Sequence, residues 1–207
     1  WRMMFIIEGA PAIIWAFFWW CLVKDKVKDA QWLSESQKND VEEQLALEQQ
    51  NIKPVKNYAE AFRSRVVILR CFQYALWSIG VYGFVIWLPS IINEAPNMNI
   101  VKTGWLSSVP YLLAIVMMLA VSHYSDKILQ RKEFIWPFLL AGAIAFYGSY
   151  LVGTHHFWLS FSLLVIAGGA MYAPYGPFFA MITEILPRNV AGGAIALINS
   201  LGALGSF

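Results

Sequence analysis

Long apolar runs dominate this sequence, and they restrict its fold more than any other feature. Crossing a hydrocarbon core about 30 Å thick takes roughly 20 helical residues. Six runs reach, approach or begin that length: Phe5–Val23, Val66–Ile92, Trp105–Val121, Phe134–Val152, Phe157–Leu186 and Val190–Phe207. Because backbone polar groups find no water at that depth, each run is expected to be helical. With 58% hydrophobic residues, the chain is too apolar for an ordinary soluble domain, and an all-α membrane protein is predicted.

The lysines and arginines between these runs are distributed unevenly. Alternate gaps hold twelve of them, whereas the intervening gaps hold only Arg2 and Lys102. The twelve are Lys24, Lys26, Lys28, Lys38, Lys53, Lys56, Arg63, Arg65, Lys127, Arg131, Lys132 and Arg188. Since positively charged loops are retained in the cytoplasm, the first set of gaps is expected to be cytoplasmic. The first helix then runs from outside to inside, and the following helices alternate.

Residues 24–65 form the only long polar gap, and we predict a cytoplasmic loop there. Ser34 followed by Gln37 has the pattern of a capping box, and Val41, Leu45 and Glu48 follow at helical spacing. A short amphipathic helix on the cytoplasmic face is therefore expected, and after it a linker that contains Pro54.

No catalytic constellation is present in the sequence. It has no Gly-x-Ser-x-Gly, no His-Glu-x-x-His and no glycine-rich phosphate loop. His123, His155 and His156 lie at predicted helix ends, where solvated or interfacial histidines are expected. An enzyme, a metal site and a bound cofactor are therefore not predicted, and no basic stripe suggests nucleic acid.

Polar side chains recur along one face of the run Phe157–Leu186. Tyr172, Tyr175, Phe179 and Thr183 are spaced i, i+3, i+7 and i+11, which places them on one face of a helix. Glycines and prolines interrupt the same run, which a membrane helix tolerates where neighbouring helices or a watery cavity satisfy the freed carbonyls.

Two other predicted helices carry similar polar faces. Tyr74, Ser78 and Tyr82 recur every four residues, and the last run adds a stripe of small residues with the amide of Asn199. We expect a shared polar cavity that binds substrate, although such groups can also simply bond between helices. The candidate substrate-binding residues are Tyr74, Ser78, Tyr82, Tyr172, Tyr175, Thr183 and Asn199.

Two charged residues lie inside predicted spans, where charge is costly. Arg70 is about one turn into its run and can extend its side chain to the cytoplasmic surface, which is the expectation here. Glu8 lies about two turns into the first run, and a structural partner is favoured over a proton-carrying role.

One loop has a recognisable pattern, Ser122-His-Tyr-Ser-Asp126-Lys127-Ile-Leu-Gln-Arg131-Lys132. It resembles the cytoplasmic loop motif of the major facilitator superfamily, Gly-x-x-x-Asp-Arg-x-x-x-Arg-Arg, with serine at the first glycine and lysine at two arginines. Further stretches resemble the anion:cation symporter family within it. They are Trp1-Arg2-Met-Met-Phe-Ile-Ile-Glu8-Gly9-Ala-Pro11, Tyr82-Gly83-Phe84-Val-Ile-Trp87-Leu88-Pro89, Val109-Pro110-Tyr111 and Gly193-Ala-Ile-Ala-Leu-Ile-Asn199-Ser200.

The resemblance implies a partial superfamily fold, covering helices six to eleven of twelve. Residues 1–23 would be the last helix of the first half, residues 24–65 the central loop, and residues 66–207 the second-half bundle with its last helix truncated. Members of the family import small organic anions such as sugar acids, usually with protons. A proton-coupled symporter in a bacterial inner membrane is therefore expected, and a passive facilitator without proton coupling is the alternative. Many members have Gly-Asn where this chain has Gly202-Ala203, so the preferred anion can differ.

The loop residues also suggest an inner gate. Asp126 could accept hydrogen bonds from backbone N–H groups near Asn189–Ala191, at the start of the last helix. Arg131 could reach Glu184 in the outward-facing state, and this pair would break as the cytoplasmic side opens. The alternative is a static surface ion pair, which would contribute less than about 1 kcal/mol.

Overall fold

The computed structural model describes residues 2–24, 26–50, 55, 57–96, 98–153 and 155–205, and all regular structure within them is helical. The chain divides into two compact units, Trp1–Asn51 and Ile52–Phe207. The first unit contains α1, the 3₁₀ turn η1 and α2, which span Arg2–Leu22, Val27–Asp29 and Glu35–Gln50. The second contains α3 (Tyr58–Arg63), α4 (Arg65–Asn93), α5 (Ile100–Ile128), η2 (Arg131–Phe134), α6 (Trp136–Val152), α7 (Phe157–Tyr172), α8 (Tyr175–Ile185) and α9 (Arg188–Leu204). The fold is all-α, as predicted.

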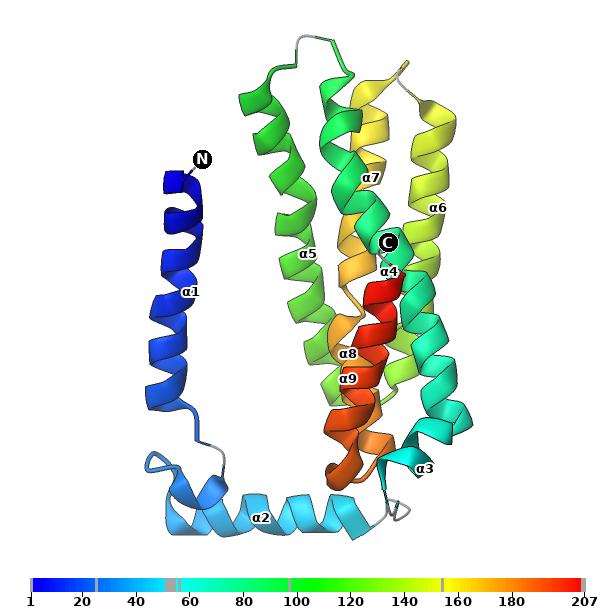
Figure 1. The fold of residues 1–207 in the computed structure, drawn as a ribbon. Helices are drawn as coiled ribbons and strands as arrows, with labels where there is room; N and C mark the ends of the chain where they lie inside the picture. The colour runs from blue at the N-terminus through cyan, green and yellow to red at the C-terminus, as the bar shows by residue number, and fades with distance from the viewer. Residues whose placement is uncertain are drawn as a thin grey trace. The chain divides into compact units, whose positions relative to one another are not determined.

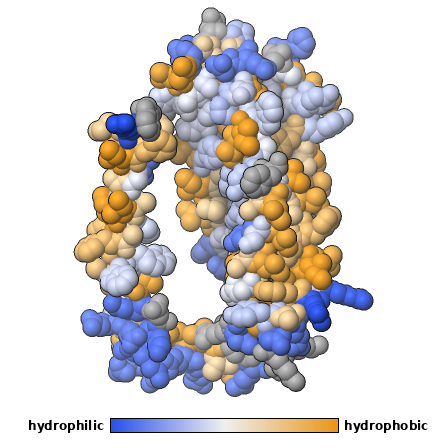
Figure 2. Space-filling view, viewed as in Figure 1, coloured by the Kyte–Doolittle hydropathy of each residue, from blue (hydrophilic) through white to orange (hydrophobic). Residues whose placement is uncertain are grey.

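In the first unit, α1 and α2 differ sharply in character. The 21 residues of α1 are almost all apolar, and none of them is buried. Figure 2 shows mostly hydrophobic side chains along α1 and mostly hydrophilic ones over η1 and α2. A helix this long and this apolar, with its side chains unburied, is suited to lipid or to other membrane helices.

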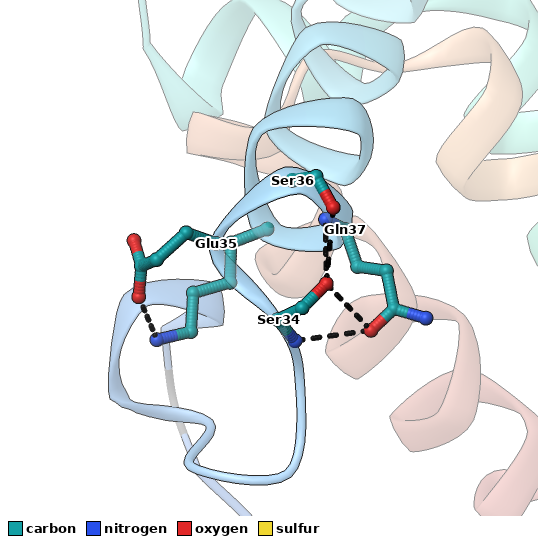
Figure 3. A network of polar contacts seen from close by, with 5 residues as sticks. Ser34, Glu35, Ser36 and Gln37 are labelled. Carbon is teal, nitrogen blue, oxygen red and sulfur yellow. Dashed lines mark hydrogen bonds and ion pairs between the residues drawn. The ribbon is translucent and has the colours of Figure 1, made fainter.

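The predicted capping box at the start of α2 is confirmed (Figure 3). The Ser34 amide donates to Oε1 of Gln37 at 3.0 Å, and the Gln37 amide donates to Oγ of Ser34 at 3.3 Å. Val41 and Leu45 are half-buried, in agreement with the expected apolar face. The side chain of Glu48 and residue Pro54 lie outside the described part of the chain.

Removing the capping hydroxyl should loosen the first turn of α2. Ser34→Ala is expected to lower its local stability by about 1 kcal/mol, because the amide of Gln37 loses its acceptor. Amide hydrogen exchange at Gln37 should then accelerate by about fivefold. Ser36→Ala is the matched control, since the hydrogen bond of the Ser36 hydroxyl in the described part of the chain is to the Ser34 hydroxyl, at 3.1 Å, and not to a backbone amide. Equal exchange in both variants would contradict the capping role.

The helices of the second unit follow the predicted runs, but their ends differ from the predicted ones. Helix α5 extends five residues before and seven after the predicted Trp105–Val121. It begins where the side chain of Asn99 accepts a hydrogen bond from the Lys102 amide at 2.9 Å. Capping positions, rather than apolarity, therefore define where this helix starts.

The run Phe157–Leu186 was predicted as one interrupted helix, and the structure divides it into α7 and α8 at Ala173 and Pro174. The physical reason lies in the two prolines, Pro174 and Pro177. Neither has an N–H group to donate to the preceding turn. The indole of Trp77 donates to one of the carbonyls at the break, that of Met171, at 3.1 Å. A neighbouring helix thus satisfies a backbone group that the break exposes.

Small residues allow the helices of this unit to pack closely. Helix α7 lies against both α5 and α6. A Cβ atom on Gly168 would come within 2.9 Å of both the Phe84 ring and Pro110. Between α6 and α7, the hydroxyls of Ser149 and Ser160 form a buried hydrogen bond of 2.8 Å. Close contact at small residues and a buried polar pair are both typical of membrane helix packing.

The end of the predicted loop is ordered and belongs to the second unit. Helix α3 lies against α9, where the ring of Tyr58 occupies the space that a side chain on Gly193 would need. Asn189 donates from Nδ2 to the carbonyl of Val55 at 2.9 Å. The helical bundle therefore begins several residues before the predicted first residue, Val66.

Within the described residues, five segments are long and apolar enough to cross a membrane. They are Arg2–Leu22, Arg65–Asn93, Ile100–Ile128, Arg131–Val152 and Phe157–Ile185. The last of these contains the break between α7 and α8. Residues Asn189–Leu204 form a shorter apolar helix.

Candidate functional site

An aromatic cluster lies where α4 meets α8 and the break that precedes it. We define it by Tyr74, Trp77, Tyr172, Tyr175, Phe178 and Phe179. The ring centroids of Trp77 and Tyr175 are 4.5 Å apart, and those of Tyr74 and Phe178 are 5.5 Å apart. Tyr172 and Tyr175, on either side of the break, stack at 5.7 Å. These separations are those of favourable aromatic pairs, so the cluster forms a rigid wall.

The cluster contains three of the seven predicted substrate-binding residues, Tyr74, Tyr172 and Tyr175, and the fourth predicted tyrosine, Tyr82, lies outside its definition. Tyr74 is buried, Tyr172 and Tyr175 are half-buried, and Tyr82 is 45% exposed. The ring centroids of Tyr74 and Tyr175 are 6.3 Å apart, so tyrosines of α4 and α8 face each other. Phenol hydroxyls both donate and accept hydrogen bonds. The arrangement can therefore hold a small polar molecule against an aromatic surface.

Tyr111 joins this group, and the sequence reasoning missed it as a site residue. Its ring centroid lies 6.0 Å from that of Tyr172. Tyr111 follows Pro110, which is fully buried against α7 near Gly168. A proline inside an apolar run, followed directly by a tyrosine, was the available signal, but only the crossing of α5 and α7 shows what it contacts.

Ser78, the fifth predicted residue, lies beside Tyr74 at the contact between α4 and α9. It is only 3% exposed. A Cβ atom on Gly202 would overlap the ring of Tyr74 and lie 3.0 Å from Oγ of Ser78. The absence of a side chain at Gly202 therefore creates the space that Tyr74 occupies.

The remaining two predicted residues are not part of the cluster. Thr183 is exposed, and its hydroxyl donates to the carbonyl of Ala180 at 2.8 Å, a bond within its own helix. Asn199 is also exposed, on α9 one turn before Gly202. The sequence predicted one continuous helix face from Tyr172 to Thr183. In the structure α7 ends at Tyr172 and α8 begins at Tyr175, so the regular helical spacing does not continue across the break.

The predicted contact between Arg131 and Glu184 is present. Nε of Arg131 donates to Oε1 of Glu184 at 2.9 Å, and the same guanidinium pairs with Asp126. Nη1 of Arg131 also donates to Oγ of Ser125 at 3.1 Å, and Ser125 is fully buried. The guanidinium thus joins the end of α5 to α8.

The predicted hydrogen bonds from the start of α9 to Asp126 are not found among the described residues. The amides of Val190 and Ala191 both donate to the carbonyl of Pro187, each at 3.0 Å. The Asp126 carboxylate is bound by Arg131 instead. An amide already used within its helix cannot also satisfy a carboxylate well, and the arginine offers the stronger partner.

One apolar cavity lies away from the aromatic cluster. Its volume is about 540 Å³, and its lining comes from α4, α6 and α7, including Trp87, Phe146 and Phe157. Most of its lining is apolar, and its polar groups include the carboxylate of Glu94 and the paired hydroxyls of Ser149 and Ser160. We place the candidate site at the aromatic cluster, where tyrosines from α4, α7 and α8 meet.

Comparison with known proteins finds that this chain is similar to several transport proteins. The "Quinolone resistance transporter" of Acinetobacter baumannii is 25% identical over 209 residues, covering 100% of this chain and 48% of the relative. A "Putative tartrate transporter" of Agrobacterium vitis is 28% identical over 209 residues, covering 100% of this chain and 46% of the relative. The "Sodium-dependent phosphate transport protein 1" of Rattus norvegicus is 29% identical over 138 residues, covering 65% of this chain and 29% of the relative.

The chain spans about half the length of the bacterial relatives it matches. The family model of the Major Facilitator Superfamily matches residues 1–207. Together with the apolar helices, this match identifies a multi-pass membrane protein with a partial superfamily fold. The chain belongs to the Major Facilitator Superfamily.

Proposed function

We propose that the protein carrying this sequence is a secondary active transporter that takes up a small organic anion, such as a sugar acid, together with a proton. Transport would proceed by alternating access around a central site. The loops rich in lysine and arginine would face the cytoplasm of a bacterium, and the helices would cross its inner membrane.

The observation that carries this proposal is the aromatic cluster at the break between α7 and α8. Discontinuous membrane helices often mark substrate sites, because their irregular backbone is tolerated only where protein or a cavity surrounds it. Here the break places Tyr172 and Tyr175 side by side, opposite Tyr74 on α4. A few hydroxyls set in an aromatic wall suit a small polyhydroxy acid.

The proposed gate would act at the other end of α8. Arg131 bridges Asp126 and Glu184, and breaking these pairs would accompany opening of the cytoplasmic side. The pairs would then favour the outward-facing state by their own interaction free energy.

The names of the relatives support an organic anion as the substrate, but they do not agree on a coupling ion. One is named as a tartrate transporter and another as a sodium-dependent phosphate transport protein. The quinolone resistance transporter favours a second candidate, movement of an aromatic drug, which the same aromatic wall could accommodate. A passive facilitator without ion coupling is a further outcome of the test below.

Uptake by the complete natural protein in proteoliposomes tests the proposal. The panel contains labelled tartrate, galactonate, phosphate and a quinolone, each with and without an inward proton gradient and with and without sodium. Gradient-dependent accumulation of tartrate or galactonate is expected. Accumulation driven by sodium alone, or only equilibration, would contradict proton symport, and movement of the quinolone alone would favour the second candidate.

Removing single hydroxyls from the cluster tests the site itself. Tyr74→Phe, Tyr172→Phe and Tyr175→Phe keep each ring but remove one hydrogen-bonding group, so each should raise the KM for uptake by about three- to tenfold. Tyr147→Phe is the matched control, because Tyr147 is exposed on α6 and outside the cluster. Replacing Ser78, Tyr82, Thr183 and Asn199 by alanine completes the set. Unchanged uptake in all seven at matched expression would contradict the proposed site.

A further inference from the structure

Arg70 does not extend its side chain back toward the start of α4, as the sequence suggested. Its Nη1 donates to Oε1 of Gln73 at 2.6 Å, one turn further along the helix. Its Nη2 lies 2.7 Å from the sulfur of Met181 on α8. The side chain is half-buried, and it crosses from α4 to α8. The guanidinium thus points into the bundle, away from Arg65 and the helix end.

The guanidinium of Arg70 is poorly satisfied there. It has five N–H donors, and among the described residues its hydrogen-bond acceptors are one amide oxygen and a thioether sulfur, which is a weak acceptor. None of the carboxylates in the described residues forms an ion pair with it. A charge within a membrane span is costly unless an opposite charge or a polar ligand compensates it.

Arg70 lies on α4 one helical turn before Tyr74, the first residue of the aromatic cluster. Helices α4 and α8 are antiparallel, and their contacts form successive levels: Trp77 with Tyr175, Tyr74 with Phe178, and Arg70 with Met181. Arg70 and Tyr74 are four residues apart, so they share a face of α4 with a rise of about 6 Å between them. A molecule bound against the tyrosines can therefore reach the guanidinium.

The packed side of Arg70 leaves no room for a ligand. The cavity there measures about 10 Å³ and is lined by aliphatic side chains such as Val67, Ile182 and Ile198. That volume barely accommodates one water molecule. An anion would therefore have to approach the guanidinium from a side other than this cavity.

We propose that Arg70 binds a carboxylate of the transported anion while the hydroxyls of that anion contact the tyrosines of the aromatic cluster. This inference rests on the proposed function. A guanidinium presents two parallel N–H donors to a carboxylate, which gives a strong and directional contact. Arg70 would thereby select anions over neutral sugars of the same size.

The test uses the complete natural protein and the panel anion with the lowest KM in the uptake assay described above. Arg70→Gln removes the charge, and Arg70→Lys keeps it but loses the planar fork. Arg65→Gln is the matched control, because Arg65 is exposed on the same helix, five residues earlier. The two measurements are the KM for uptake and the rise in Tm that the anion causes in the purified protein.

Arg70→Gln should raise the KM at least about tenfold and abolish the anion-induced rise in Tm. Arg70→Lys should raise the KM about threefold, and Arg65→Gln should change neither measurement. A lower Tm without anion combined with an unchanged KM in Arg70→Gln would overturn the proposal and assign Arg70 a structural role. If Arg70→Gln does not fold, a wild-type KM in Arg70→Lys would overturn it equally. Absence of anion uptake by the wild type would instead overturn the proposed function, and the role of Arg70 with it.

Discussion

Adding one methyl group at Gly202 should destabilise the protein strongly, whereas adding the same group at Gly192 should not. A Cβ atom on Gly202 would overlap the Tyr74 ring, which is itself held between Trp77 and Phe178. Because the ring cannot move without disturbing the cluster, α9 must shift away from α4. Gly202→Ala is expected to cost about 1–3 kcal/mol of unfolding free energy, measured as a fall in Tm in detergent.

Gly192 is the matched control on the same helix. A Cβ atom there would meet no atom within 4 Å. Gly192→Ala should therefore be neutral or stabilising by about 0.5–1 kcal/mol, because alanine loses less backbone entropy than glycine in a helix. Equal Tm values for the two variants would show that α4 and α9 are not packed as closely as described. A combined variant, Gly202→Ala with Tyr74→Ala, should recover part of the loss at Gly202, since the overlapping ring is then absent.

Neutralising Arg131 should have the largest effect on transport among the changes at the cytoplasmic end. Its side chain is only 10% exposed and serves two carboxylates, Asp126 and Glu184. Arg131→Gln leaves both carboxylates without their partner, and uptake is expected to fall by about tenfold. Glu184→Gln should have a smaller effect, because Asp126 remains bound and Glu184 is already 45% exposed.

A double-mutant cycle separates a gate from a static surface pair. If Arg131 and Glu184 act through each other, the variant with both glutamines should transport no worse than Arg131→Gln alone. Lys132→Gln is the control, since Lys132 is the exposed neighbour of Arg131. A charge swap should restore transport only in part, because a glutamate at position 131 would face Asp126. Additive losses in the cycle, or equal losses for Lys132→Gln, would contradict the gate.

Local chemistry explains why parts of the structure were predictable from the sequence. The capping box at Ser34 and Gln37 was found correctly, since its two hydrogen bonds join residues three apart. The existence of α4, α5 and α6 also followed from the length of their apolar runs. The contact of Arg131 with Glu184 was only a hypothesis about an inner gate, because its partners are 53 residues apart.

The errors share one physical cause, which is that they depend on contacts between helices. The run Phe157–Leu186 was treated as one face, yet two prolines divide it, and the indole of Trp77 binds a carbonyl at the break. Asp126 was assigned to the start of α9, but the guanidinium of Arg131 binds it. Arg70 was expected to extend toward the helix end, but Gln73 and Met181 hold it inside.

The sequence by itself determined that this is a multi-pass helical membrane protein, because hydrophobic length and the cost of unpaired backbone groups in lipid are properties of single segments. Only the tertiary structure decided which tyrosines meet. Tyr74, Tyr111 and Tyr175 lie on three helices, and their approach depends on where glycines such as Gly202 and Gly168 let the backbones come close. A contact between two helices depends on the shapes of both helix surfaces, and the sequence of one helix does not determine the shape of the other.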